Sequence, residues 1–155
     1  MVKAMAEGLE SAKVQEGGCR VLLRGHWHAQ NNAVIGGGGG IQAVLAAMRQ
    51  HPSQGAVQEQ GCGALRNLAY NADNRVKIAG AGGVEAIVTA MTQHPSAAGV
   101  QEQGCGALWN LAYSNAANKA KINAAGGAQA IRAAMAAHPS SFKVQSWGQG
   151  ALGCL

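Results

Sequence analysis

The chain has 155 residues, of which 48% are hydrophobic and 4% aromatic, and its net charge is +5. This length fits one domain, and its core must be built from aliphatic side chains and cysteine. Twenty-three glycines without a three-residue period exclude a collagen-like fold. No apolar run is long enough to cross a membrane. The first ten residues lack the apolar stretch of a secretion signal, so we expect an intracellular protein, cytoplasmic or nuclear.

A segment of about 43 residues recurs along the whole chain. The stretch "VQEQGCGALRNLAY" (57–70) returns as "VQEQGCGALWNLAY" (100–113) with one letter changed. Self-similarity at this period is typical of repeat proteins, in which stacked units bury faces that one unit alone leaves exposed. We expect a single array over 1–155 that consists of a partial copy (1–13), a degenerate copy (14–56), two further copies (57–99 and 100–143) and a partial copy (144–155).

The first full copy departs most from the pattern. "RGHWHA" (24–29) stands where the other copies have Asn-Leu-Ala, so we expect this copy to pack less well. One hypothesis is a frame slip in the gene, because the codons of His-Trp-His read Leu-Ala when shifted by two nucleotides. Five glycines follow at 36–40, in phase with 79–83 of the next copy. No P-loop Lys-Ser/Thr follows them and no strand is expected before them, so we interpret them as an interhelical turn.

Each copy is predicted to form three helices. In the second full copy, "NRVKIAGA" (74–81) is the first and shortest helix, and Asn74 is its expected cap. Gly82 and Gly83 follow directly. Glycine adopts positive φ angles readily, so we predict a sharp turn at this pair.

The second and third helices of that copy carry apolar stripes at helical spacing. The second helix, through 84–91, ends where Pro95 pushes the preceding residue out of the α region. The third helix, about 97–113, is the longest, and Ser96 is its expected cap. The stripes of one copy are buried only if neighbouring copies stack against them.

The period and two motifs resemble those of the armadillo repeat family. The motifs are "ALRNLA" (64–69) with "ALWNLA" (107–112), and "IAGAGGVEAIVTAM" (78–91) with "INAAGGAQAIRAAM" (122–135). The resemblance implies an all-α fold, a right-handed α-solenoid superhelix of three-helix repeats. It also implies a concave groove lined by the third helices, which typically holds an extended peptide.

The resemblance also assigns candidate partner-binding residues. Asparagines on the third helix bond the peptide backbone in that family, and the matching positions are Asn67 and Asn110. The side-chain slots one turn earlier hold Gly63 and Gly106 instead of tryptophan, and a chain of +5 does not suit a basic peptide. Further candidates are Arg66 and Trp109, which are adjacent to the asparagines, and Gln60 and Gln103, which lie seven residues before them. Arg24 is the candidate in the first copy.

We therefore expect a non-enzymatic scaffold that binds a protein or an extended peptide and needs no cofactor. The alternative is a polyanion, such as nucleic acid or an acidic membrane surface, bound through a basic face on which Lys77 and Lys121 recur in phase. Charged residues make up only 12% and form no long block, so the peptide is favoured. Neither end resembles a polar capping repeat, so we also expect self-association or a longer array.

The cysteines are expected to be structural. Cys19, Cys62 and Cys105 occupy one position in successive copies, and helices about 8–10 Å apart hold them too far from one another for disulfides. No histidine recurs near them as a base, so an enzyme acting through Cys62 or Cys105 is the least favoured alternative. "GHWH" (25–28) places its histidines at i and i+2, on different helix faces, so no metal site is expected.

Overall fold

The computed structural model describes the backbone of residues 2–24 and 29–155 and the side chains of 2–22 and 33–155. The predicted irregularity at 24–29 and its histidine pair therefore fall mostly outside the described residues. As predicted, the described part is all-α, with eleven helices and no strand. The helices are α1 (Val2–Glu7), α2 (Ala12–Arg24), α3 (Ala29–Gly37), α4 (Gly40–Gln50), α5 (Gly55–Leu68), α6 (Ala72–Gly80), α7 (Gly83–Gln93), α8 (Ala98–Ala112), α9 (Ala116–Ala124), α10 (Gly127–Ala137) and α11 (Phe142–Cys154).

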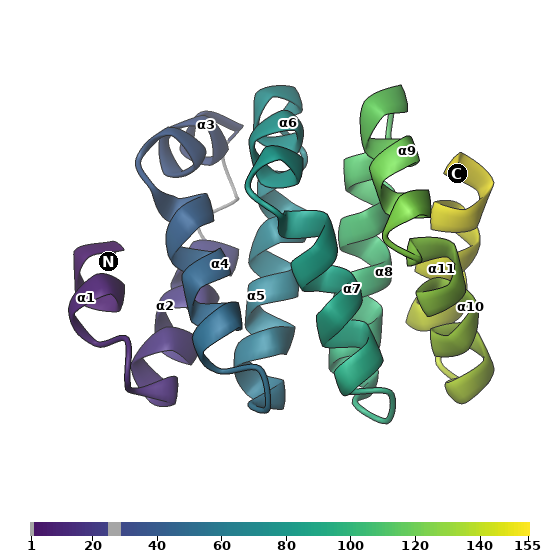
Figure 1. Cartoon of the computed structure of the whole chain (residues 1–155), viewed down its shortest axis with the longest axis horizontal. Helices are drawn as coiled ribbons and strands as arrows, with labels where there is room; N and C mark the ends of the chain where they lie inside the picture. The colour runs from purple at the N-terminus through teal and green to yellow at the C-terminus, as the bar shows by residue number, and fades with distance from the viewer. Residues whose placement is uncertain (1, 25–28) are drawn as a thin grey trace.

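The helices lie in three rows, and within each row every helix contacts the next (Figure 1). The long row consists of α2, α5, α8 and α11, with 13 to 15 residues each. The middle row consists of α1, α4, α7 and α10, and the short row of α3, α6 and α9, with nine residues each. The described termini lie at opposite ends of the rows. Across the described ranges, no helix has the length and hydropathy that a membrane crossing requires.

A glycine in the left-handed conformation precedes three helices of the middle row. Gly39, Gly82 and Gly126 have φ angles of 83°, 83° and 80° before α4, α7 and α10. Residues other than glycine rarely adopt this backbone conformation. The turn predicted at Gly82 is therefore confirmed, and so is the interpretation of the glycine run at 36–40 as a turn of the same kind.

Two predicted helix caps are wrong. The side chain of Asn71, not Asn74, caps α6: Asn71 has the extended conformation of a cap and accepts the Asn74 N–H. Asn74 is instead buried in the helix, where its Nδ2 donates to the Leu68 carbonyl. Ser96 does not cap α8, because the chain makes a further turn in which the Ala97 N–H bonds the His94 carbonyl. The helix then begins after Ala97.

The core is aliphatic throughout the described part of the chain, and it includes three cysteines. Cys19, Cys62 and Cys105 are completely buried, and all are free thiols. Burial away from water raises the pKa of each thiol from its ordinary value of 9.0 to about 12. The prediction of buried cysteines is therefore confirmed, whereas Cys154 is only half-buried.

The glycine before each buried cysteine lets the middle row approach the long row closely. A Cβ added to Gly61 would lie 2.6 Å from Cγ of Met48, and one added to Gly104 would lie 2.6 Å from Cγ of Met91. Gly18 and Gly148 meet methionines of the middle row in the same way. The methionine of the neighbouring helix fills the space that a side chain at each of these glycines would occupy, so the helices remain closely packed.

The glutamine of each Val-Gln pair holds the end of a middle-row helix. The last carbonyls of a helix have no partner within it. Nε2 of Gln58 donates to the carbonyls of Met48 and His51, at 2.9 Å each. Gln101 makes the same two bonds one copy later, and Gln15 and Gln145 do so at the two ends.

The histidines before proline link successive loops. His94 Nε2 lies 2.7 Å from the carbonyl of Pro52, and His138 Nε2 lies 2.8 Å from the carbonyl of Pro95. His51 contacts the carbonyl of Leu9, the in-phase position of the preceding loop. Each of these histidines thus joins two segments that are 42 or 43 residues apart in the chain.

Candidate functional site

Five of the chain's six aromatic residues line two pockets beside the long row. The sequence contains three tryptophans, two tyrosines and one phenylalanine. Two pockets of about 380 Å³ each share Trp147, and no described residue of the middle row lines either one. The sixth aromatic residue, Trp27, lies outside the described residues. We call this surface the aromatic face and define it by Tyr70, Trp109, Tyr113, Phe142 and Trp147.

The aromatic face is open to solvent. Tyr70, Tyr113 and Phe142 are 58%, 60% and 83% exposed, and both tryptophans are half-buried. Among the described residues, every aromatic side chain therefore lies outside the buried core. Aromatic rings usually contribute most to a core when they are buried. This surface thus differs from the rest of the described surface in its content of aromatic side chains.

The two tryptophans lie edge to face across the gap between α8 and α11. Their ring centroids are 5.4 Å apart with an interplanar angle of 65°. Trp109 lies over Gly150, where an added Cβ would be 2.9 Å from the ring. Likewise, a Cβ on Gly106 would lie 2.7 Å from Cδ of Arg66 and 3.5 Å from Trp147. Gly106 of Gly-Cys-Gly and Gly150, the in-phase glycine of Gly-Gln-Gly, thus leave space in which these large side chains pack against the backbone.

Two arginines stack on the rings of the aromatic face. The guanidinium carbon of Arg66 lies 5.3 Å from the centroid of Trp147, and that of Arg75 lies 5.9 Å from the centroid of Tyr113. Each geometry is within the range of an attractive cation–π contact. Nη1 of Arg75 also donates to the carbonyls of Ala69 and Tyr70 at the end of α5, at 3.1 and 3.4 Å. These contacts fix Arg75 beside the first pocket.

The two asparagines assigned by resemblance occupy different environments. Asn67 is buried, with 1% exposure, and its Oδ1 accepts a 3.4 Å bond from Nε of Arg66. Asn110 is half-buried and lines a pocket of the aromatic face. Its Nδ2 donates to the Arg66 carbonyl at 2.9 Å, and it makes no other hydrogen bond with described residues. One amide hydrogen and the amide oxygen of Asn110 thus remain for a partner.

The other candidate residues are distributed unevenly. Gln103 lines the second pocket with Arg66, while Gln60 is half-buried on α5 and lines neither pocket. Arg24 ends α2, and its side chain is outside the described residues. Sequence reasoning missed Trp147, although a signal was present. Trp147 stands in the last partial copy at the position that Gln103 occupies one copy earlier.

A negative charge also borders the aromatic face. Glu102 lines the second pocket, and its carboxylate lies 3.2 Å from Nζ of Lys143, which lines the same pocket. The Glu102 side chain is 19% exposed, so this pair is less screened by solvent than a fully exposed pair. The two pockets therefore differ in how their charges are arranged: Arg66, Glu102 and Lys143 line the second, whereas Arg75 is the one charged residue among the described residues that line the first.

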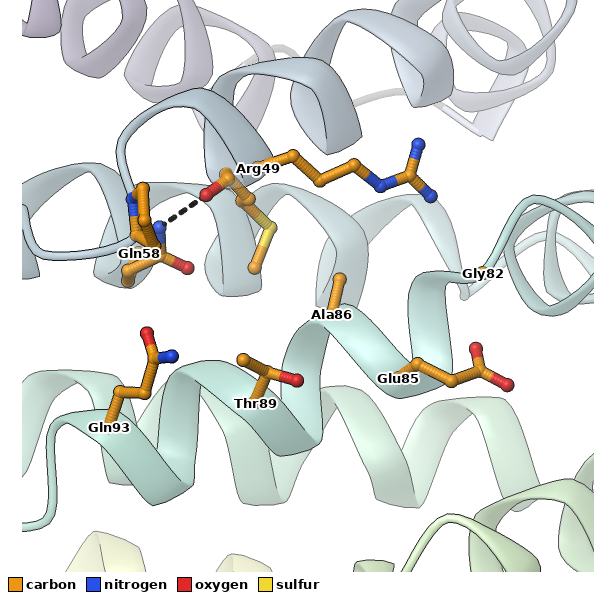
Figure 2. A pocket seen from close by; sticks show the side chains of 9 residues that line it. Arg49, Gln58, Gly82, Glu85, Ala86, Thr89 and Gln93 are labelled. Atoms are coloured by element: carbon orange, nitrogen blue, oxygen red, sulfur yellow. Dashed lines mark hydrogen bonds between the residues drawn. The ribbon is translucent and has the colours of Figure 1, made fainter.

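A third pocket, of about 380 Å³, lies between α4 and α7 of the middle row. Figure 2 shows Gln58 turned toward the end of α4 and Arg49 extending along the pocket toward Gly82. Both side chains are already engaged: Gln58 bonds the Met48 carbonyl, and Nη2 of Arg49 donates to the Ala81 carbonyl at 2.7 Å. Gln58 and Arg49 thus bond carbonyls at the ends of α4 and α6, respectively.

The same gap recurs along the middle row. A pocket of about 140 Å³ lies between α7 and α10, and another of about 370 Å³ lies between α1 and α4. In-phase residues line them, for example Ala86 in one and Ala130 in another. A gap that recurs at the sequence period follows from small side chains in the packing. The aromatic face differs because its tryptophans do not recur in phase.

The basic residues considered for polyanion binding lie on the short row. Lys77 and Lys121 are exposed on α6 and α9, and Nζ of Lys121 lies 3.3 Å from the Ala79 carbonyl. Within the described residues, no three His, Cys, Asp or Glu side chains converge as a metal site would require. The histidines of "GHWH" are outside that set.

Comparisons with protein-family models, with curated proteins and with solved structures gave no match. The chemistry of the aromatic face is therefore the basis for a functional argument. Its rings offer apolar area, its guanidinium groups donate hydrogen bonds, and Asn110 can both donate and accept. This combination suits non-covalent recognition of another molecule.

Proposed function

We propose that the chain is a right-handed α-solenoid of armadillo type and that it binds a protein or an extended peptide on its aromatic face, without acting as an enzyme. Three features support the solenoid. The glutamine bonds of Gln58 and Gln101 are identical one copy apart, and the histidine links of His94 and His138 repeat at the same period. Each helix in the three rows also contacts the in-phase helix before it.

The composition of the aromatic face carries the functional proposal. Trp, Tyr and Arg dominate the residues that contribute most to protein–protein binding. Here two tryptophans, two tyrosines and two arginines surround pockets at the surface, while the core contains no described aromatic residue. Partly exposed rings lose favourable burial unless something covers them. A bound partner would supply that cover.

Asn110 gives the proposed site its polar contact. Asn110 lines the pocket that Trp109 and Trp147 also line, and its second amide hydrogen and its oxygen make no hydrogen bond with described residues. A side-chain amide presents one donor and one acceptor in a plane, which matches the N–H and C=O of an extended peptide. Asn67 is buried, so we assign the backbone contact to Asn110 and none to Asn67.

The alternative partner, a polyanion, is less well supported. A phosphate chain that followed the long row would meet the Glu102–Lys143 ion pair beside Trp147, where the carboxylate offsets one of the two cations that line the second pocket. Lys77 and Lys121 lie on the short row, and Lys121 is already near the Ala79 carbonyl. Polyanion binding depends on many unpaired cations on one track. Strong, salt-sensitive binding of an oligonucleotide would favour this alternative instead.

Selection from a random peptide display library tests the proposal. The immobilised chain should enrich peptides that the variants Trp109→Arg and Trp147→Gln do not retain. Both variants install the residue that the chain itself has one copy earlier, Arg66 or Gln103, so they should keep the fold, as circular dichroism can verify. The control is Thr89→Ala, which installs the in-phase residue Ala133 in a middle-row pocket.

Two outcomes would contradict the proposal. One is that no peptide is enriched over blank beads. The other is that the two tryptophan variants retain the same peptides as the parent chain and the Thr89→Ala control. Either result would separate the aromatic face from partner binding.

A further inference from the structure

We infer that the peptide bound on the aromatic face carries an acidic side chain next to an apolar anchor residue, and that Arg75 binds the carboxylate. This inference rests on the proposed function, because it names the chemistry of the partner at the same site. The Arg75 guanidinium is held in one orientation by its contacts, but two of its nitrogens have no hydrogen-bond partner among the described residues.

Arg75 is held from two sides. Its Nη1 donates to the carbonyls of Ala69 and Tyr70, and its guanidinium lies over the Tyr113 ring. These contacts use one edge and one face of the planar group. Because the group is already ordered, little side-chain entropy is lost when it binds a further acceptor.

The other edge of the guanidinium has no partner. Nε of Arg75 is buried and makes no hydrogen bond with described residues, and Nη2 likewise makes none. Together these two groups form the parallel N–H pair that a carboxylate accepts with both oxygens. A buried N–H without an acceptor destabilises its surroundings. A carboxylate of the partner would accept from Nη2 directly, and it would reach Nε, which is buried in this structure, after a shift of the Arg75 or Tyr113 side chain.

The surrounding charges favour one carboxylate over other anions. Among the described residues that line the first pocket, Arg75 is the sole charged group, and Arg66 lies across the Trp147 ring. An apolar pocket with one cation attracts a single negative charge more strongly than water-exposed lysines do. In the second pocket, which the same tryptophan lines, Glu102 pairs with Lys143, so Arg66 and Lys143 do not form a continuous run of free cations for a chain of phosphates.

The remaining space of the first pocket suits an apolar anchor. Its volume of about 380 Å³ lies near the lower end of the range for small-ligand sites, about 300–1,000 Å³. Its walls are the rings of Tyr70, Trp109, Tyr113 and Trp147. Asn110 lines the same pocket, so a backbone contact and a side-chain anchor can come from one short segment. We therefore assign the carboxylate to an internal Asp or Glu of an extended peptide.

A display library of random peptides with fixed sequences at both ends tests this inference. We expect enriched sequences to contain Asp or Glu within two positions of an aromatic residue or leucine. The best peptide is then synthesised with an amidated C-terminus, both as selected and with Asp replaced by Asn or Glu by Gln. Titration followed by calorimetry should show that loss of the charge weakens binding by about tenfold to a hundredfold.

Three variants assign the effect to Arg75. Arg75→Gln should bind the acidic peptide and its amide form equally. Arg75→Lys installs the in-phase residue Lys119, so it should fold, and it should discriminate less well because an ammonium group lacks the paired donors. Lys77→Gln, a change two residues along α6 that lies outside both pockets, should discriminate as the parent chain does.

The possible outcomes separate the two proposals. If peptides are selected but the parent chain binds the acidic and amide forms equally, the inference about Arg75 is overturned while the proposed function stands. If no peptide is enriched, both are overturned. If a single-stranded thymidine oligonucleotide displaces the selected peptide at lower concentration than the peptide itself, the partner is a nucleic acid and both are again overturned.

Discussion

Helices α5 and α8 are built from nearly the same sequence, yet they present different surfaces. Their segments 57–70 and 100–113 differ at one position, Arg66 against Trp109. Toward the core the two helices are equivalent, because the cysteine of each is completely buried and the glutamine of each holds the middle-row helix before it. Toward solvent, Arg66 stacks on Trp147, whereas Trp109 lies over Gly150.

The difference shows that the exposed surface is a joint property of neighbouring helices. Asn67 and Asn110 belong to segments that differ at one residue, but only Asn110 lines a pocket of the aromatic face. That pocket exists because α11 contributes Trp147 at the position where α8 has Gln103. One unit therefore cannot define the site. The two pockets require α8 and α11 of the long row, together with α5, which contributes Arg66.

The largest expected effect tests whether the two helices are equivalent in the core. Leu65 and Leu108 are in phase, and both are completely buried. We expect Leu65→Ala and Leu108→Ala to lower the free energy of unfolding by about 3 kcal/mol each, since each change removes buried methyl groups and leaves a cavity. Urea unfolding measures both. A difference of more than about 1 kcal/mol between them would show that the cores around α5 and α8 are not equivalent.

The second prediction contrasts two glutamines of α8. Gln101→Ala removes the donor from the carbonyls of Met91 and His94, so we expect a loss of about 1–3 kcal/mol in the free energy of unfolding. Gln103→Ala should change it by less than about 0.5 kcal/mol, because the buried Oε1 of Gln103 has no hydrogen-bond partner among the described residues. Equal losses in thermal unfolding would contradict the assignment of Gln101 as a cap.

The third prediction concerns alkaline pH and the buried thiols. Burial raises the pKa of Cys62 from 9.0 to about 12, so the folded chain keeps this proton while the unfolded chain loses it. The stabilising contribution is complete below pH 9 and is lost as pH rises toward 12. Between pH 8 and 10 we expect each such thiol to reduce stability by about 1 kcal/mol. The free energy of unfolding of Cys62→Ala, followed by urea unfolding, should decrease less over this interval. An equal decrease in Cys62→Ala and the parent chain would show that the Cys62 thiol does not keep its proton in the fold.

The fourth prediction concerns the one position where the two helices differ. Trp109→Arg makes 100–113 identical to 57–70. It removes the edge-to-face contact with Trp147, so we expect a loss of about 1 kcal/mol in the free energy of unfolding. Peptide binding should nevertheless be lost. A loss above about 3 kcal/mol in urea unfolding would show that Trp109 mainly stabilises the fold.

Much of the fold followed from periodicity and glycine placement. The helix positions and the positive φ angle at Gly82 could be predicted, because apolar spacing and glycine pairs are local signals. Helix caps were harder. The choice between Ser96 and Ala97 depends on a hydrogen bond to the His94 carbonyl, which places the start of α8 one residue later.

The site could be predicted only in part, because it depends on contacts between copies. Asn110 was identified from a motif, but the burial of Asn67 depends on packing that the motif does not encode. The contact between Arg66 and Trp147 joins residues from α5 and α11, two copies apart. The in-phase exchange of Gln103 for Trp147 was visible in the sequence. Its meaning required the position of Trp109 on the neighbouring helix.

Calorimetric titration of one selected peptide tests the aromatic face as a binding surface. We expect Trp147→Gln to weaken binding by at least about tenfold, because a central tryptophan of an interface typically contributes more than about 1–2 kcal/mol. We expect Thr89→Ala, which lies in a middle-row pocket, to bind as the parent chain does. Equal affinity of the parent chain and Trp147→Gln would contradict the claim that the aromatic face is the binding surface.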